Sequence, residues 1–260
     1  RQQQAGNFQN QIFQMIEGEK LGSFWGYTFA GVWQEDDVNA PFVDANGQTN
    51  GKTNGEVYKV KPGNSKYVDV NKDGVYNDAD QGIIGCGQPT FNWGWNNTFN
   101  YKNFDFSFFV VGFHGFDIYN ATHQMGYNLI KSQQMAGVTP MRELLNRWTP
   151  TNTNTDIPGF VKGGTENKDF FSTRFVENGS FIKMKSITLG YTLPEATCRS
   201  LGINNLRVYA SVQNPFHITK YSGLDPEATM GSPLVQGVDW GAYPNSRNYL
   251  IGLNLSLIHI

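Results

Sequence analysis

The stretch "FNWGWNNTFNYKNFDFSFFVVGF", residues 91–113, decides the fold because its apolar side chains recur at every second position. The side chains that share one face of its first half are Phe91, Trp93, Trp95, Phe99 and Tyr101. In the second half, Phe104, Phe106, Phe108 and Val110 alternate with polar residues that include Asp105 and Ser107. A period of two is typical of a β-strand with two different faces. Because only Lys102 and Asn103 separate the halves, the stretch predicts a tight hairpin.

The same alternation recurs in four other segments of the chain. Near the start, Trp25, Tyr27 and Phe29 share one face of "GSFWGYTFAGVW". The later segments are "SITLGYTLP" (186–194), "NLRVYASVQN" (205–214) and "YLIGLNLSL" (249–257). With the hairpin, these make about six strands of roughly nine to twelve residues, the length that crosses a membrane when the strands are tilted.

The connections between these strands alternate between short and long. Two are short, at Lys102–Asn103 and Pro194–Asn205, and three are long and polar: 34–88, 114–180 and 215–247. Long loops are unusual in a compact soluble domain. Short turns on one side and long loops on the other are typical of transmembrane barrels, whose aromatic girdles would here include Trp33, Phe91, Tyr101 and Tyr249.

The polar faces of the strands favour a membrane barrel over a soluble β-sandwich. A sandwich would also bury one apolar face. Its outer face, however, would normally carry many Lys and Glu residues, whereas here it is mostly Asn, Ser, Thr, Gly and Gln. The sequence therefore predicts an all-β fold, part of a transmembrane antiparallel β-barrel with long extracellular loops.

The composition excludes several functional classes. The 260 residues carry a net charge of −2, which does not indicate a nucleic-acid-binding surface. Charged residues make up 16%, against about 25% in ordinary soluble domains, while aromatic residues make up 14%. No apolar run approaches the length of a membrane-spanning helix.

Nothing in the sequence predicts an enzyme. The four histidines form no metal-binding motif, and the two cysteines, Cys86 and Cys198, are far apart. The neighbouring carboxylates Asp78 and Asp80 fall within a loop and not on opposed strands, so they do not indicate an acid–base pair. We expect the two cysteines to lie on opposite sides of the membrane and to remain unbonded.

A calcium-type loop lies in "YVDVNKDGVYNDAD", residues 67–80. Calcium prefers oxygen ligands at fixed spacing, with a glycine at the sixth position for the sharp turn, which here is Gly74. The predicted metal ligands are Asp69, Asn71, Asp73, Val75 (through its carbonyl), Asn77 and Asp80. We expect a structural Ca²⁺ on which the side-chain oxygens converge. The alternative is a turn whose Asp and Asn side chains only cap nearby backbone N–H groups.

The flanking sequences exclude an EF-hand, which needs a helix on each side of the loop. Upstream, "VYKVKPGNSKYV" contains Pro62 and Gly63, and downstream "QGIIGCGQPTFNWGW" contains four glycines and Pro89. Neither is a helix of useful length. The loop is thus set among strands. A soluble, calcium-stabilised carbohydrate-binding β-sandwich could also carry such a loop, and it is the alternative hypothesis to the barrel.

Successive blocks of the chain resemble the SusC/RagA family of TonB-dependent outer-membrane transporters. The blocks follow the family's order and are "GSFWGYTFAGVWQ", "KYVDVNKDGVYNDADQGIIGCGQPTFNWGWNNTFNYKNFDFSFFVVGFHGFDIYNAT", "RFVENGSFIKMKSITLGYTLP", "LRVYASVQNPFHITKYSGLDPE" and "GVDWGAYPNSRNYLIGLNLSL". The resemblance implies that residues 1–260 are the C-terminal portion of such a barrel, about six of its 22 strands. It also implies that the plug domain and signal peptide lie outside this sequence.

The resemblance implies a function in import across the outer membrane of a Gram-negative bacterium. Expected substrates are glycans, or in some members peptides. Expected partners are a SusD-like surface lipoprotein that acts as a lid, TonB through the N-terminal region, and the lipid of the membrane. The family usually ends on an aromatic residue, whereas this chain ends in Ile258, His259 and Ile260, so no function is expected of His259.

Overall fold

The computed structural model describes residues 12–13, 16–127, 141–159, 170–229 and 236–257. The chain divides into two compact units. The loop-rich unit comprises Arg1–Gln88, Asp117–Glu177 and Gly231–Gly241, and the long-sheet unit comprises Pro89–Phe116, Asn178–Met230 and Ala242–Ile260. Within the described ranges, no helix is both long enough and apolar enough to span a membrane.

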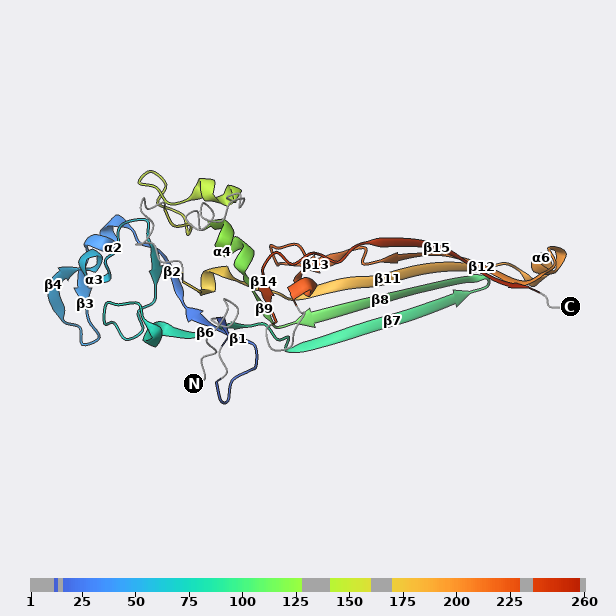
Figure 1. Ribbon diagram of the computed structural model, residues 1–260, viewed down its shortest axis with the longest axis horizontal. Helices are drawn as coiled ribbons and strands as arrows, with labels where there is room; N and C mark the ends of the chain where they lie inside the picture. The colour runs from blue at the N-terminus through green and yellow to red at the C-terminus, as the bar shows by residue number, and fades with distance from the viewer. Residues whose placement is uncertain (1–11, 14–15, 128–140, 160–169, 230–235, 258–260) are drawn as a thin grey trace. The chain divides into compact units, whose positions relative to one another are not determined.

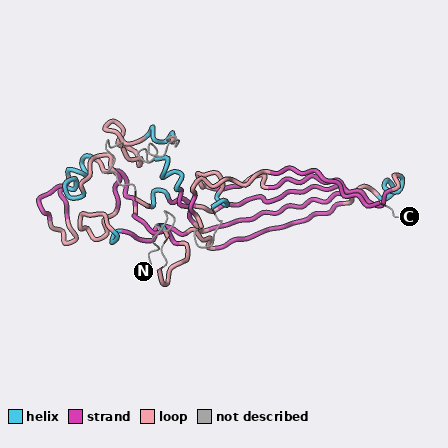
Figure 2. Tube along the Cα trace, in the orientation of Figure 1, coloured by secondary structure: helices cyan, strands magenta, loops and turns pink. Residues whose placement is uncertain are grey.

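The long-sheet unit is one antiparallel sheet of long strands that lie side by side (Figures 1 and 2). Its order is β15-β12-β11-β8-β7, and the short β13 pairs with β11. The strands are β7 (Phe91–Tyr101), β8 (Phe104–His114), β11 (Phe181–Thr192), β12 (Ile203–Gln213), β13 (His217–Thr219) and β15 (Asn248–Leu257). The sequence prediction placed β7, β8, β12 and β15 correctly to within a residue or two, and the predicted fold class is confirmed.

The predicted hairpin is present. Tyr101 pairs with Phe104, and Lys102 takes a left-handed φ of 52°, as two-residue hairpin loops require of a central residue. Asn103 then ties this turn to the end of β11, because its side-chain amide donates to the Thr192 carbonyl at 2.9 Å.

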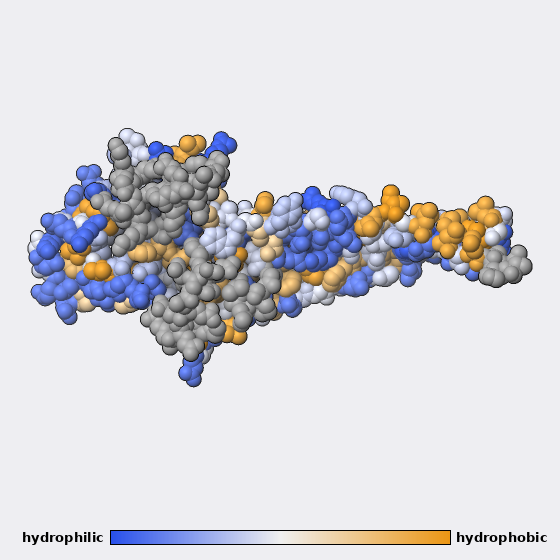
Figure 3. All heavy atoms as spheres, in the orientation of Figure 1, coloured by the Kyte–Doolittle hydropathy of each residue, from blue (hydrophilic) through white to orange (hydrophobic). Residues whose placement is uncertain are grey.

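Cross-strand pairs show that the two faces of the sheet differ as predicted, because residues directly opposite one another share a face. Phe106 pairs with Phe99 on one side and Leu189 on the other, and Leu189 pairs with Ala210. Ser107 pairs with Thr98 and Thr188, on the opposite face. Apolar residues (orange in Figure 3) gather over the long strands toward the short helix α6 (Glu195–Ser200). Phe109 and Leu250 are apolar exceptions on the polar face.

The polar face carries an ion pair that crosses β11. Arg207 on β12 donates to Asp105 on β8 through Nε at 2.9 Å and through Nη2 at 2.5 Å. Gly190 of β11 lies between them, and a Cβ there would come within 2.4 Å of Asp105 Oδ1. The glycine therefore provides the space for the pair.

The other elements of the long-sheet unit are short. The β11–β12 turn holds α6 (Glu195–Ser200), and the β13–β15 connection holds the 3₁₀ turn η4 (Pro226–Thr229). Glu195 and Arg199 form an ion pair one turn apart on α6, which suits an exposed helix.

The loop-rich unit contains small sheets joined by turns. β1 pairs with β6, β2 with β5 and β3 with β4, while β9 lies between β10 and β14. Its strands are β1 (Ser23–Tyr27), β2 (Phe29–Val32), β3 (Pro41–Val43), β4 (Thr49–Thr53), β5 (Ser65–Tyr67), β6 (Gln81–Cys86), β9 (Asp117–Asn120), β10 (Val176–Asn178) and β14 (Val238–Asp239). Its helices and 3₁₀ turns are α2 (Glu35–Asn39), α3 (Asn54–Tyr58), α4 (Ala121–Tyr127), η1 (Asp78–Asp80), η2 (Arg142–Asn146) and η3 (Thr173–Phe175).

The prediction for residues 22–33 was wrong in one respect. This segment forms β1 and β2, which pair with β6 and β5 and not with the long sheet. The alternation suggested one exposed face, but Phe24 and Tyr27 are both buried. Trp33 is also buried, at 3% exposure, so it is no girdle residue, whereas Phe91, Tyr101 and Tyr249 are exposed as predicted.

The core of the loop-rich unit forms around β1 and β9. Its fully buried members are Ile12, Phe24, Tyr119, Ala121 and Phe175. The Phe24 ring meets Phe13 and Tyr119 edge-on, at centroid distances of 5.5 and 6.4 Å. This core joins β1 to β9, which are far apart in the sequence.

Candidate functional site

The predicted calcium-type loop joins β5 to β6 in the loop-rich unit. Its sharp turn is at Gly74, where φ is 81°. A Cβ at this position would lie 2.2 Å from the Val57 side chain, so both the backbone conformation and the packing require glycine. The sixth position of the loop is therefore as the sequence predicted.

The first and last acidic residues of the loop bind its backbone. Asp69 Oδ2 accepts hydrogen bonds from the Gly74 N–H and the Tyr58 hydroxyl, both at 2.8 Å. Asp80 is 3% exposed and accepts from the N–H groups of Val70 and Asn77 at 2.8 and 2.9 Å. These two carboxylates close the loop across its base.

The middle of the loop is a chain of Asx turns. Asp73 Oδ1 accepts from the Val75 N–H at 2.8 Å, and its Oδ2 accepts from the side-chain amides of Asn71 and Asn77. The Asn77 amide also donates to the Val75 carbonyl at 3.1 Å. The hydrogen bond from the Val75 N–H is the main cause that lowers the pKa of Asp73, and the side-chain amides of Asn71 and Asn77 lower it further.

The fit of this loop to a metal ion is partial. Among the described residues, no three His, Cys, Asp or Glu side chains gather closely enough to hold one. Each of the three carboxylates is engaged by backbone N–H groups, as in the turn alternative. However, Asp69 Oδ1 is buried without a hydrogen-bond partner, which leaves one oxygen of the donor set unused.

A pocket walled by tyrosines adjoins the loop, with a volume of about 340 Å³. Its lining residues are Val57, Tyr58, Lys59, Val60, Ser65, Tyr67, Gly74, Val75, Tyr76 and Phe170. Tyr58 stacks on Tyr76 with ring centroids 5.2 Å apart, and Tyr67 meets both Tyr76 and Phe170 edge-on. Because Gly74 and Val75 belong to both, the shape of the pocket depends on the loop.

The hydroxyls of Tyr58, Tyr67 and Tyr76 each form a hydrogen bond within the protein. Burial is the main cause that raises the pKa of Tyr76 to about 12, and it also raises the pKa of Tyr58, with a further contribution from the bond to Asp69. The Tyr67 hydroxyl accepts from the Phe170 N–H at 3.1 Å. The pocket consequently presents ring surfaces more than hydroxyl groups.

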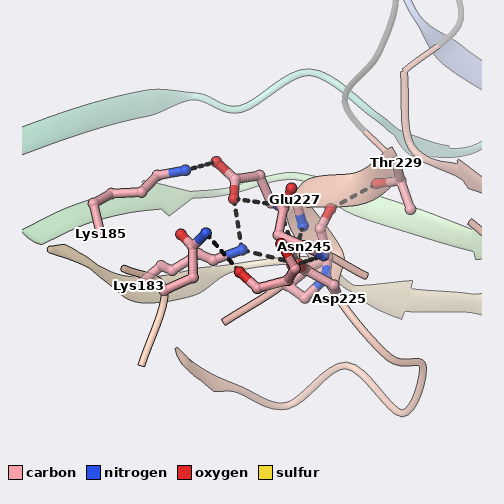
Figure 4. A network of polar contacts seen from close by, with 9 residues as sticks. Lys183, Lys185, Asp225, Glu227, Thr229 and Asn245 are labelled. Atoms are coloured by element: carbon pink, nitrogen blue, oxygen red, sulfur yellow. Dashed lines mark hydrogen bonds and ion pairs between the residues drawn. The ribbon is translucent and has the colours of Figure 1, made fainter. Parts of the chain in front are cut away.

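A second polar cluster lies in the long-sheet unit, where a loop folds back onto the sheet (Figure 4). Lys183 of β11 is 2% exposed, and its Nζ donates to Asp225 at 2.8 Å and Glu227 at 2.6 Å. Lys185 also pairs with Glu227, and the Asn245 amide donates to both carboxylates. The cluster fixes the loop around η4 to β11.

Opposing effects act on the two carboxylates of this cluster. Burial would raise the pKa of Asp225 and of Glu227, but their bonds to Lys183 and other donors outweigh it, so both pKa values lie below the usual range. Both groups are therefore charged at neutral pH. No pattern in the sequence indicated this cluster, because Lys183 and Asp225 are 42 positions apart.

Both cysteines, which lie in described parts of the chain, are free thiols, as expected. Cys86 is in β6 of the loop-rich unit, and Cys198 is buried in α6 of the long-sheet unit. His259 lies outside the described residues. No catalytic role was predicted for any of the three.

Comparison with known proteins shows relatives along nearly the whole chain, although no family model matches it. TonB-dependent receptor P3 of Formosa agariphila is 34% identical over 257 residues, which cover 96% of this chain and 24% of that receptor. TonB-dependent receptor SusC of Bacteroides thetaiotaomicron is 32% identical over 197 residues, or 75% of this chain and 18% of that receptor. The chain thus spans about a quarter, or less, of the length of these curated relatives.

Solved structures show the same fold. A structure of the RagAB peptide transporter matches 90% of this chain, and 22% of its own, with a TM-score of 0.65 and 24% identity. The RagAB peptide importer in its closed-closed state matches 90% of this chain, and 23% of its own, with a TM-score of 0.63 and 25% identity. The long sheet therefore corresponds to part of a transporter barrel.

Proposed function

Because the chain belongs to the SusC/RagA family of TonB-dependent outer-membrane transporters, we propose that the intact receptor imports glycans, or alternatively peptides, across the outer membrane of a Gram-negative bacterium. The observation that carries this proposal is the two-faced long sheet. Its apolar face suits lipid, and its polar face, with few charges, suits the interior of a barrel.

The proposal includes two protein partners. A SusD-like surface lipoprotein would cover the extracellular opening, and TonB would drive import through the N-terminal region of the receptor. Support comes from the relatives, which are named as TonB-dependent receptors and include SusC. The role proposed for residues 1–260 is to form barrel wall and loops, not to catalyse a reaction.

We propose that the loop at Asp69–Asp80 binds a structural Ca²⁺ that stiffens it. The ligand spacing and the unused Asp69 Oδ1 support this. Since the described side chains do not gather three acidic ligands, the loop would have to draw Asp73 and Asp80 inward when the ion binds. A weak site suits the millimolar calcium outside cells.

Uptake in living cells tests the import function. The full-length receptor and its lid lipoprotein would be expressed in a host that lacks its own copies and offered labelled oligosaccharides or peptides. We expect uptake that stops when tonB is deleted, when the lid is omitted or when an uncoupler removes the proton gradient. Uptake that survives all three treatments would contradict active import.

A further inference from the structure

The loop that follows β13, residues 220–229, folds back onto one face of the long sheet and is called here the η4 loop (Figure 4). We propose that this loop lies inside the barrel and narrows the import passage at its outer mouth, with Leu224 as the side chain that limits the width of a substrate. The inference rests on the proposed import function. It goes beyond that function by naming the part of the chain that sets a size limit.

The register of the strands places the η4 loop on the interior face of the sheet. Lys183 of β11 pairs with Val111 of β8, which pairs in turn with Gly94 of β7. The aromatic residues of β7 occupy odd positions, so Gly94 and the residues opposite it belong to the polar face, which is the interior of a barrel. Because Lys183 is 2% exposed and binds Asp225, the η4 loop covers that interior face.

A bulge in β11 brings a second lysine to the same face. Along a regular strand, Lys185 and Ser186 would point to opposite faces. The pairing of β11 with β8 skips Lys185 and resumes at Ser186, so Lys185 is the extra residue of a bulge. Lys183 and Lys185 consequently both bind Glu227 of the η4 loop, as Figure 4 shows.

The η4 loop is also anchored from the side of β15. Asn245 lies just before β15, and β12 separates β15 from β11 in the sheet. The backbone N–H and the side-chain amide of Asn245 donate to Asp225 Oδ2 at 3.1 and 3.2 Å, and the amide also donates to Glu227 at 2.9 Å. The loop therefore bridges two parts of the wall that are not neighbours.

Hydrogen bonds within the η4 loop hold it in one conformation. Asp225 Oδ1 accepts from the Glu227 N–H, and the Asp225 carbonyl accepts from the Ala228 N–H, both at 3.1 Å. The Thr229 hydroxyl donates to the Pro226 carbonyl at 2.8 Å. Asp225, Pro226 and Thr229 are all buried. Burial and internal hydrogen bonds oppose local opening, so the loop is a fixed part of the wall.

The tip of the η4 loop presents one large apolar side chain. Leu224 is 69% exposed, whereas Asp225 beside it is 3% exposed. On the other side, Gly223 packs against the Tyr221 ring, because a Cβ there would lie 2.4 Å from that ring. Since the backbone on both sides of Leu224 is packed and the loop lies on the interior face, its exposed side chain faces the space that a substrate must cross.

The position of the anchors along β11 places the narrowing at the outer mouth. Lys183 is the third residue of β11, and this strand follows the long connection 114–180. The opposite end of β11 leads to the short connection that contains α6. In transmembrane barrels the long loops are extracellular and the short turns are periplasmic. The η4 loop therefore lies near the extracellular end of the passage.

A fixed loop inside a barrel restricts what can pass, because the width of a passage decides which solutes cross it. The anchoring cluster joins two lysines to two carboxylates, so their charges balance. The apolar tip at Leu224 adds neither a charge nor a hydrogen-bonding group. The limit should therefore act on the width of a substrate and not on its charge.

Thiol labelling of the full-length receptor in intact cells tests where the η4 loop lies. Leu224→Cys is compared with Lys52→Cys, an exposed residue of β4 in the long connection 34–88, after Cys86→Ser and Cys198→Ser remove the native thiols. The reagents are a small membrane-impermeant maleimide and the same maleimide on a long polyethylene glycol chain. We expect the small reagent to label both variants, and the large one to label Lys52→Cys about tenfold faster or more.

Two labelling results would overturn the inference. If the large reagent labels both variants equally fast, the loop lies outside the barrel. If the small reagent fails to label Leu224→Cys, this residue does not face an open passage. The anchors are tested by adding Asp225→Asn with Glu227→Gln to Leu224→Cys, which should speed labelling by the large reagent several-fold, whereas adding Glu195→Gln should not. Unchanged labelling after loss of both carboxylates would contradict the anchoring role of the cluster.

Uptake by the receptor and its lid lipoprotein tests the size limit. Leu224→Trp and Leu224→Ala change an exposed side chain, so neither should disturb folding. Leu201→Trp is the matched control, because Leu201 follows α6 and is 61% exposed at the short-turn end. The labelled probes are a linear and a branched glucohexaose, and a linear and a cyclic hexaalanine. In each pair the second probe is the wider one.

We expect Leu224→Trp to lower the ratio of wide to narrow probe taken up several-fold and Leu224→Ala to raise it, with no change in Leu201→Trp. The same ratio in wild type and both Leu224 variants, with TonB-dependent uptake intact, would overturn the size limit and leave import standing. Uptake by wild type that does not depend on TonB would remove import itself, whatever the ratio.

Discussion

At residue 190 of β11, the missing side chain lets two charged residues meet across a strand. A Cβ on Gly190 would lie 2.4 Å from Asp105 Oδ1 and 2.5 Å from Arg207 Nη2. The sequence showed a glycine on the polar face but could not show that it separates an ion pair, because the partners come from the strands on either side.

We therefore expect Gly190→Ala to destabilise the receptor by about 1–3 kcal/mol, the usual cost of forcing atoms into an occupied space. Gly82→Ala is the matched control, since a Cβ at this strand position meets open space. Melting temperatures in detergent would be compared. A drop of the same size in both variants would show that the loss comes from glycine itself and not from the ion pair.

Tyr58 and Tyr76 predict a stability change at alkaline pH. Burial raises both pKa values, that of Tyr76 from 10.0 to about 12, so the folded protein holds these protons more tightly than the unfolded chain. The tighter binding of the proton adds to the free energy of unfolding. For Tyr76 this addition is fully present below pH 10 and is lost as the pH rises toward 12. The melting temperature should fall more steeply above pH 10 in wild type than in Tyr76→Phe. Parallel curves for the two proteins would contradict the burial of this hydroxyl.

Among the elements, β11 shows where the alternation of apolar and polar side chains fails to predict the bounds of a strand. The sequence placed its start at Ser186, but the strand begins at Phe181. Its pairing with β8 shifts between Met184 and Ser186, so the alternation changes phase there. Lys183 and Lys185 also obscured the strand in the sequence. Lysine is rarely buried, so the 2% exposure of Lys183 was not expected, and Lys185 is only partly exposed.

The cluster around Lys183 predicts how the η4 loop is held. Removing one partner of a buried ion pair usually costs 3–5 kcal/mol. We expect about 3 kcal/mol for Asp225→Asn, since Glu227 still pairs with Lys183. Protease should then cut residues 215–247 sooner than in wild type. Glu195→Gln, which breaks only the exposed pair on α6, is the control and should change neither measurement.

The same cluster sets the response to acid. The pKa values of Asp225 and Glu227 are lowered in the folded state. The two ionised carboxylates therefore stabilise the fold at pH values above the usual carboxyl pKa range, and this stabilisation is lost as the pH falls through their pKa values in the folded protein. Wild type should lose loop protection in acid more steeply than Asp225→Asn. An equal response of the two proteins to acid would show that these carboxylates do not hold the loop.

The loop at Asp69–Asp80 tests the calcium proposal. Calcium should protect wild type, but not Asp69→Ala with Asp73→Ala, from proteolysis within the loop, because these changes remove the unused oxygen and the central carboxylate. Asp78→Ala, outside the predicted ligand set, should behave as wild type. If millimolar calcium protects neither wild type nor the double variant, or both equally, the loop is only a chain of Asx turns.

For the whole molecule, the sequence predicted strands whose two faces lie in different surroundings. It did not predict the arrangement of strands that are buried on both faces. The hairpin of β7 and β8 was predicted because lipid and interior impose opposite side chains on alternate positions. Around β1 and β2, Phe24 and Tyr27 are both buried, so the alternation there did not report a membrane face. The pocket walled by tyrosines was not predicted, because its walls join segments such as 57–60, 74–76 and 170.

The central claim is that the long sheet is part of a transmembrane barrel wall, and β8 tests it most directly. Spin labels would be placed singly at Phe104, Asp105, Phe106, Ser107 and Phe108 of the full-length receptor in lipid bilayers. Collisions with oxygen, which concentrates in lipid, and with a water-soluble nickel complex would then be measured at each site. Oxygen should dominate at the three phenylalanine positions and the nickel complex at Asp105 and Ser107, with a period of two. Equal access to the nickel complex at all five positions would contradict the barrel.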